Sequence, residues 1–420
     1  MAAKKKSSKQ TKKAATNSSK LSSQHVITHF HTVTSSTTQG SNVTGVDPPV
    51  ASADIVKATN SYESWLSKQT AVVAADLERK HQQMAVSPFI LLRATFYRFA
   101  EQWPQLSGAA GDAPIVVAVG DLHIENFGTW RDSEGRLVWG VNDFDETCCA
   151  PFTVDLVRLA VSAILAIEQN HLSITPAAAC EAILSGYKES IKAGGRAFVL
   201  AEDHGWLRDI AVASLKKPAE YWRKLTALPK QISVAPVSAI ECLERLMPER
   251  DLKYELVHRV AGEGSLGRPR YTGIASWHGG FVARDVKAML PSAWQWAGSH
   301  QGPYEILYTV AVGRAVRCQD PIVHSNGQWI GRRIAPDCSR IELISLNPES
   351  DEANLLSSMG WETANIHLGT PAAAEQIKAF LKSGPPNWLE SAAEKYVAAI
   401  KRDWEDWKAH ITTASNGEHS

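Results

Sequence analysis

Apolar residues recur at intervals of three and four over several long stretches of the chain, which is the spacing of one face of a helix. Pro88 is expected to open a helix, because proline is well tolerated in the first helical turn. The predicted helices cover residues 53–103, 153–193, 205–247, 303–317, 351–368, 371–383 and 387–411. A helix-rich protein is therefore expected.

Shorter apolar runs bounded by Gly, Pro or polar turns predict strands. One run, 113–121, would deliver Asp121 at the end of a buried strand, and a second covers 136–146 after the turn signal RDSEG. Further strands are expected at 254–262, 268–277 and 280–290, and a hairpin across 327–343. The later group predicts a small sheet of its own.

The length of 420 residues exceeds one average domain, and Lys plus Arg balance Asp plus Glu at 44 each. Seven lysines in the first twenty positions and no acidic residue before Asp47 predict a disordered tail over residues 1–50. A solubilising arm and a tether to nucleic acid or an anionic surface both fit this tail; elsewhere no nucleic-acid partner is expected.

No apolar run reaches the roughly 18 residues of a membrane span, and no signal core follows the lysines, so a cytoplasmic location is the expectation. The six cysteines show no CxxC pair, which indicates reduced thiols and no structural zinc site.

The run GDLHIENFG at 120–128 spaces Asp121 and Asn126 five residues apart. In the catalytic loop of protein kinases an Asp at this interval deprotonates the acceptor hydroxyl, and the Asn holds magnesium. Asp143, in VNDFDE, is the expected second metal ligand. The arms NFGTW and RLVWGV predict a hairpin that brings Asn126 and Asp143 to one end of paired strands.

Each part of this pattern has a simpler explanation. A Gly-Asp pair after a strand is often an ordinary turn, and Asn126 can cap backbone. His123 is expected to support the loop by a hydrogen bond and not to act as a base. Asp145 and Glu146 are candidate metal or substrate contacts, or merely solvated carboxylates.

The run GEGSLG places Gly262, Gly264, Ser265 and Gly267 between two predicted strands. A dinucleotide site would open a helix after the third glycine, whereas a strand here is typical of the kinase phosphate loop. Glycines let backbone amides approach phosphates. Lys287, on the next strand, is the expected partner of the α and β phosphates, although an exposed strand lysine would give the same pattern.

Three other sites carry weaker expectations. Glu305 is the nearest residue placed to pair with Lys287 as the helix Glu of kinases does. Arg93 and the pair Arg332 and Arg333 are candidate phosphate or substrate contacts, or ordinary ion pairs.

Together the motifs SPFILLR, GDLHIENFGTW, LVWGVNDFDET, PFTVDLVRLAVS, GEGSLG and YVAAIKRDWEDW resemble a bacterial family, domain of unknown function 2252, over about residues 60–412. That family looks distantly similar to protein kinases and aminoglycoside phosphotransferases. The resemblance implies that Asp155 matches a structural Asp of the antibiotic kinases. The chain departs from their pattern at Val119, where they have His; at Asp145, where they have Gly; and at Ala288, where the family usually has Glu.

We therefore expect an α+β, protein-kinase-like two-lobed fold with circularly permuted lobe order, because the Gly-rich segment follows the catalytic loop. The expected parts are the tail 1–50, a helical catalytic-loop lobe 51–250, a β-rich nucleotide lobe 251–349, and C-terminal helices 350–412 packed on the helical lobe.

The expected function is phosphotransfer that depends on ATP and Mg²⁺, to an unknown small-molecule or protein hydroxyl. Two alternatives remain open: a pseudokinase-like module that binds nucleotide without catalysis, and a metal-dependent hydrolase built on Asp121, His123, Asp143 and Asp145.

Overall fold

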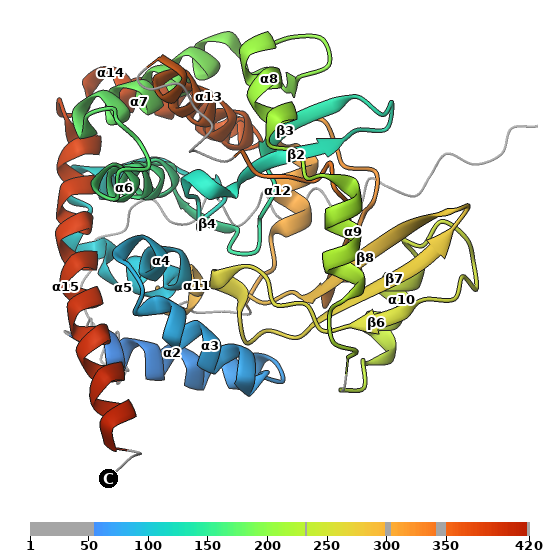
Figure 1. Ribbon diagram of the computed structural model, residues 1–420. Coiled ribbons are helices and arrows are strands. Elements are labelled where there is room, and N and C mark those ends of the chain that lie inside the picture. The colour runs from blue at the N-terminus through green and yellow to red at the C-terminus, as the bar shows by residue number, and fades with distance from the viewer. Residues whose placement is uncertain (1–53, 232, 299–303, 342–349, 418–420) are drawn as a thin grey trace, which may run out of the picture. The chain divides into compact units, whose positions relative to one another are not determined.

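The structure is a computed structural model that describes residues 54–231, 233–298, 304–341 and 350–417. These residues lie in one compact unit, Pro48–Ser420. Helices and three small antiparallel sheets make the protein mixed α+β (Figure 1). The predicted Lys-rich tail, residues 1–50, lies outside the described residues.

Helices occupy most of the segments where the apolar spacing predicts them. Pro88 opens its helix as expected, behind an N-cap at Ser87 whose hydroxyl accepts from the Ile90 amide at 3.3 Å. The helices are α2 (Ile55–Gln69), α3 (Ala74–Met84), α4 (Pro88–Ala94), α5 (Phe96–Leu106), α6 (Thr153–Glu168), α7 (Pro176–Ala193), α8 (Gly205–Ala213), α9 (Pro218–Thr226), α10 (Val237–Glu244), α11 (Ala293–Ala297), α12 (Tyr308–Arg314), α13 (Ser350–His367), α14 (Ala374–Ser383) and α15 (Trp388–Gly417).

Helix α6 is the centre of the helical part. Its residues from Thr153 to Ala166 are all buried, as expected of a helix that is apolar on every side. The long helix α15 packs along α6 and also contacts α2, α4 and α5 (Figure 1). A single large core joins these helices to β1 and the β2–β3 hairpin.

The two smaller sheets carry the segments around the first motif. Strand β1 (Ile115–Ala118) pairs with β4 (Cys148–Pro151). Strand β2 (Phe127–Arg131) pairs with β3 (Leu137–Val141), which confirms the predicted hairpin, and β3 also pairs with the short β5 (Phe198–Val199).

The third sheet has five strands in the order β6-β7-β8-β10-β9. They are β6 (Glu255–Val257), β7 (Arg270–Trp277), β8 (Gly280–Ala288), β10 (Trp329–Ile334) and β9 (Val323–Ser325). Alternate side chains point to opposite faces of this sheet. One face packs with α10, through residues such as Leu243, and the other packs with α9, through Leu225.

Several predicted boundaries are wrong. The hairpin across 327–343 is not formed, because β10 pairs with β8 on one side and with the preceding β9 on the other. The strand expected at 254–262 is only the three residues of β6, and the helix expected at 303–317 is shortened to α12. The stretch 205–247 contains α8, α9 and α10 instead of continuous helix, since Pro218 and Pro236 interrupt it.

No helix in the described ranges combines the length and the apolar character that crossing a bilayer would require.

Candidate functional site

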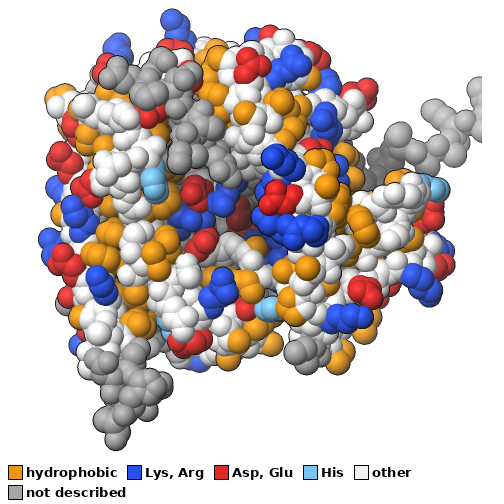
Figure 2. Space-filling model, in the orientation of Figure 1, with side chains coloured by type: hydrophobic (Ala, Val, Ile, Leu, Met, Phe, Trp, Pro, Cys, Tyr) orange, Lys and Arg blue, Asp and Glu red, His pale blue; other side chains and the backbone are white. Residues whose placement is uncertain are grey.

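A cavity of about 970 Å³ brings the two motifs together although they are well separated in the sequence. Its lining includes Asp121, Asn126 and Asp143 from the first motif and Gly262, Gly264 and Ser265 from the second. On the face drawn in Figure 2, acidic and basic side chains gather in a hollow near the middle. The volume lies in the range of small-molecule and cofactor sites.

A buried carboxylate holds the loop that follows β1. Asp155, on α6, accepts hydrogen bonds from the amides of Val119 at 2.7 Å and Gly120 at 2.8 Å. Its Oδ2 atom also lies 2.9 Å from Nε2 of His367, at the end of α13. Gly120 has φ +85°, and an added Cβ would lie 2.2 Å from the Glu146 carbonyl oxygen, so only glycine fits there. These contacts fix the backbone directly before Asp121.

Asp121 lies in this loop, three residues beyond the end of β1. Its Oδ1 accepts a hydrogen bond from Nε of Arg158 at 2.7 Å, and Arg158 is itself fully buried on α6. Burial raises the pKa of Asp121 to about 7 against the opposing effect of the Arg158 guanidinium. A carboxylate that titrates near neutral pH is suited to accept a proton.

The β2–β3 hairpin sets the position of the two predicted metal ligands. Phe127 pairs with Val141, and the Asn142 amide donates to the Asn126 carbonyl at 3.0 Å, so Asp143 follows directly after the paired strands. The Asn126 amide Nδ2 donates to the backbone carbonyl of Asp121. Its oxygen Oδ1 has no hydrogen-bond partner among the described residues and remains available as a ligand.

Asp143 and Asp145 lie close enough to influence each other, because the Asp145 amide donates to Oδ1 of Asp143 at 3.4 Å. Burial, and then the Asp145 charge, raise the pKa of Asp143. Burial also raises the pKa of Asp145, but Lys287 and Arg268 outweigh it and hold that pKa at about 2. A cation beside Asp143 would offset the repulsion between the Asp143 and Asp145 carboxylates.

Lys287 is buried on β8 and faces these carboxylates. Its Nζ atom forms an ion pair with Asp145 and lies 3.8 Å from Oδ1 of Asp143. The expectation that Glu305 would be its partner is wrong, because Glu305 is exposed and its backbone bonds Gln295. Asp145 lines the cavity, whereas Lys287 does not.

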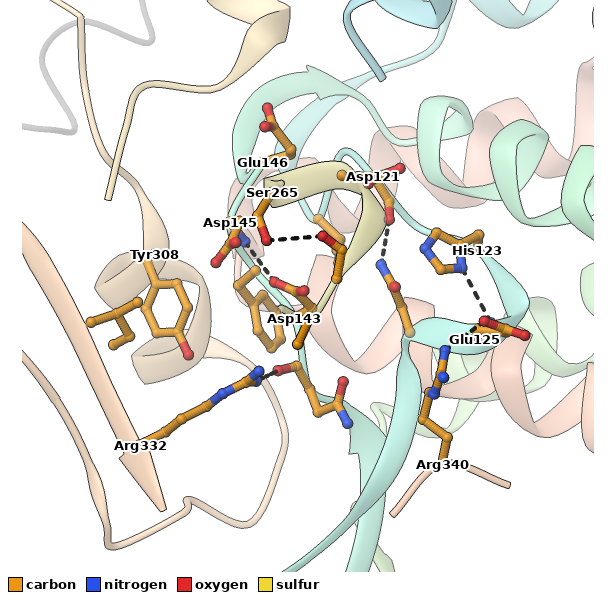
Figure 3. A pocket seen from close by; sticks show the side chains of 18 of the residues that line it. Asp121, His123, Glu125, Asp143, Asp145, Glu146, Ser265, Tyr308, Arg332 and Arg340 are labelled. Atoms are coloured by element: carbon orange, nitrogen blue, oxygen red, sulfur yellow. Dashed lines mark hydrogen bonds and ion pairs between the residues drawn. The ribbon is translucent and has the colours of Figure 1, made fainter. Parts of the chain in front are cut away.

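The Gly-rich turn, residues 262–267, lies against the first motif. An added Cβ on Gly264 would be 3.2 Å from Oδ2 of Asp121. Arg93, on α4, pairs with Glu263 of the turn at 2.7 Å and with Glu125 of the loop at 2.9 Å. Figure 3 shows the turn with Ser265 among the labelled carboxylates Asp121, Asp143 and Asp145.

Gly267 lies outside the cavity lining. It has φ +90°, and an added Cβ would be 3.1 Å from Cδ1 of Leu77. Its carbonyl accepts from the Val73 amide at 2.9 Å. In this structure Gly267 therefore anchors the turn to the start of α3.

The remaining predicted residues have supporting contacts. Nδ1 of His123 accepts from the Glu125 amide at 3.2 Å, and burial together with nearby arginines holds its pKa well below the usual range, so it is neutral. Glu146 pairs with Arg268 and accepts from the Ala293 amide at 2.7 Å. Arg332 donates to the Asn142 carbonyl at 3.2 Å, and Arg333 pairs with Asp337.

Two charged residues at the site were not expected from the sequence. Arg158 is one polar residue in the apolar helix α6, and that interruption was the available signal. Lys80 lies on α3, is buried and lines the cavity. The sequence of α3 has the pattern of an ordinary amphipathic helix, so it gives no signal for this residue. Within the described ranges, no group of three or more His, Cys, Asp or Glu side chains is arranged to hold a metal ion.

Residues 72–216 match the model of a family described as an uncharacterised protein conserved in bacteria, domain of unknown function 2252. This match supports the family resemblance of the motifs, and it covers Asp121, Asn126, Asp143 and Asp155 but ends before the Gly-rich turn. No curated protein and no solved structure matches the chain.

Proposed function

We propose that the protein is a kinase-like phosphotransferase that uses ATP and Mg²⁺ and transfers a phosphoryl group to a hydroxyl acceptor. The observation that carries this proposal is the close approach of Gly264 to Asp121, whose Oδ2 would lie 3.2 Å from a Cβ added at Gly264. This approach brings the Gly-rich motif and the first motif to one cavity. Either motif alone is weak evidence, whereas their meeting at one site is what phosphotransfer requires.

The order of elements in the five-stranded sheet supports the proposal. The Gly-rich turn connects β6 and β7, and Lys287 follows on β8, the third strand. Protein kinases arrange their glycine loop and lysine in this way. We infer a kinase-like two-lobed fold in which the sheet lobe, 251–349, follows the catalytic loop in the sequence, as in a circular permutation.

Roles follow from the contacts of each residue. Asn126 Oδ1 and the Asp143 carboxylate fit a magnesium ion, since Mg²⁺ takes few protein ligands and completes its shell with phosphate and water oxygens. Asp121 would accept the proton of the acceptor hydroxyl while the oxygen bonds the γ-phosphorus and ADP leaves. Lys287 would neutralise the phosphates after exchanging its contact with Asp145.

Unpaired donors in the cavity also fit an anionic ligand. Nε of Arg93 and the Nε and Nη1 atoms of Arg317 are buried and have no hydrogen-bond partner in the part of the chain that the structure describes, and both residues line the cavity. Buried guanidinium donors that lack a partner are costly, and a polyphosphate would satisfy them.

A nucleotide-binding module without catalysis is the second candidate. It is favoured by the ion pairs that engage Lys287 with Asp145 and Asp121 with Arg158. The hydrolase alternative has less support, because Nδ1 of His123 accepts a backbone hydrogen bond and Asp145 is paired with Lys287.

A thermal-shift titration with ATP and MgCl₂ tests the nucleotide site, because a ligand that binds the native state raises the melting temperature. We expect a magnesium-dependent shift that is lost in Asp143→Asn and Lys287→Met. Asp209→Asn, an exposed change on α8, is the matched control and should keep the shift. No shift in the wild type would refute the proposal.

Product analysis then separates enzyme from binding module. Magnesium-dependent release of ADP supports phosphoryl transfer, whereas AMP with pyrophosphate would mean adenylyl transfer. Binding without turnover, across a panel of hydroxyl acceptors that includes water, would favour the module.

A further inference from the structure

Lys80 is a buried cation that the proposed chemistry does not use. It lies on α3, is 2% exposed, and still contributes to the cavity lining. Its Nζ atom lies 5.5 Å from the ring centroid of Tyr97 and 6.0 Å from that of Tyr62. These two rings stack on each other with centroids 4.3 Å apart.

In the described part of the chain, no carboxylate lies within ion-pair distance of Lys80. The acidic residues nearest to it each pair with another residue. Asp121 is paired with Arg158 and Glu146 with Arg268. Glu63 lies 2.7 Å from His81 Nε2. Among the described residues, Lys80 is therefore a buried ammonium with no ion-pair partner that lies beside two aromatic rings.

An unpaired buried ammonium is unfavourable, and a counter-ion would relieve this cost. Burial lowers the pKa of Lys80 to about 8, so near neutral pH the amine is still largely charged and can bind an anion. Lys80 lines the same cavity as Asp121 and Glu146.

We propose that Lys80 forms an anion subsite in the cavity that takes a phosphate or carboxylate group of a ligand. The subsite itself is inferred from the burial of Lys80 and from its lack of a carboxylate partner among the described residues. Its place in catalysis rests on the proposed function, where the anion is either the transferred phosphoryl group of the nucleotide or a charged group of the acceptor.

The test is a thermal-shift titration of the full-length protein with inorganic phosphate. Phosphate replaces chloride in the buffer, so that the ionic strength stays constant. Lys80→Met keeps the length of the side chain and removes its charge. Lys192→Met, at an exposed position on α7, is the control. We expect the phosphate-dependent shift to persist in the control and the apparent phosphate affinity to fall at least tenfold in Lys80→Met.

Because Met suits a buried site, Lys80→Met should melt at or above the wild-type temperature without phosphate, which shows that the variant folds. Equal phosphate shifts in the wild type and Lys80→Met, or no shift in the wild type, would overturn the subsite. These outcomes do not depend on whether ATP binds.

Nucleotide titrations of the same variants identify the source of the anion. If the subsite takes the transferred phosphoryl group, Lys80→Met reduces the shift with ATP and magnesium but not the shift with ADP and magnesium. If it takes the acceptor's anionic group, both nucleotide shifts stay at the wild-type value while the phosphate shift is lost.

Discussion

Lys287 and Asp145, which are 142 residues apart in the sequence, form an ion pair at the edge of the cavity lining, to which Asp145 belongs and Lys287 does not. Lys287 therefore pairs with Asp145 and not with Glu305, which is exposed. The pair joins the five-stranded sheet to the segment that follows the β2–β3 hairpin.

Substitutions of Asp145 and Lys287 should have strongly non-additive effects on the free energy of unfolding. Asp145→Asn leaves Lys287 only the more distant Asp143 at 3.8 Å, and we expect a loss of about 2–4 kcal/mol in the free energy of unfolding. Adding Lys287→Met should restore part of it, since the buried charge is then gone. Urea unfolding of the two single variants and the double variant measures the coupling, and additive effects would contradict it.

The same pair has a defined pH dependence. Because the pKa of Asp145 is about 2 in the folded protein and near 4 when unfolded, its contribution is present above pH 4 and is lost as the pH falls toward 2. The stability difference between wild type and Asp145→Asn should shrink over that window.

Asp121 should show the opposite pH dependence. Its pKa is about 7 in the folded state and about 4 in the unfolded state, so the native protein binds the extra proton and loses stability as the pH rises between those values. At pH 8 Asp121→Asn should therefore be more stable than the wild type, on the order of 2–4 kcal/mol, and at pH 4 the two should converge.

Unfolding of both proteins in urea at pH 4, 6 and 8 measures this effect. If the effect of the buried Arg158 on the pKa of Asp121 outweighs the effect of burial, the wild type gains stability from the ionised carboxylate. Asp121→Asn will then be the less stable protein at pH 8. That result would remove the basis for treating Asp121 as a base that titrates near neutrality.

The cost in stability of adding a side chain at Gly267, in the Gly-rich turn, can be compared with the cost at Gly279, in the turn between β7 and β8. Both have positive φ, +90° and +81°, but only Gly267 faces a neighbour, with Leu77 3.1 Å from an added Cβ. Gly279→Ala should cost about 1–2 kcal/mol from the backbone alone, and Gly267→Ala about 1–2 kcal/mol more from crowding. Chemical denaturation measures both, and equal costs would show that Leu77 moves aside freely.

Asp155 should control the loop before Asp121. Asp155→Asn keeps the size of the side chain but turns one acceptor into a donor facing the amides of Val119 and Gly120. We expect a loss of about 2–4 kcal/mol and faster hydrogen exchange at those amides than at Val138 in β3. Unchanged protection at Val119 and Gly120 would show that other contacts hold the loop.

The sequence predicts the helices and the β2–β3 hairpin well because local spacing and turn residues determine them. It also identifies residues that reach one cavity, including Asp121, Asn126, Asp143 and Gly264. Strands β4 and β5 were not expected from the sequence. The two residues of β5 carry too little periodicity to predict a strand.

Partners across long sequence distances could not be predicted from residue types. The pairing of Lys287 with Asp145 instead of Glu305, and of Arg93 with both Glu125 and Glu263, depends on how separate elements pack. The prediction of a hairpin across 327–343 was wrong for the same reason, because β10 pairs with β8 and with the preceding β9.

The contact of Asp155 with His367 means that the smallest piece of chain able to hold the site is longer than the piece that carries its motifs. A fragment ending before α13 would keep every predicted nucleotide and metal residue, yet it would lack the imidazole that accompanies the buried carboxylate under the loop. Recognising these motifs in a shortened relative would therefore not be enough to expect an assembled site there.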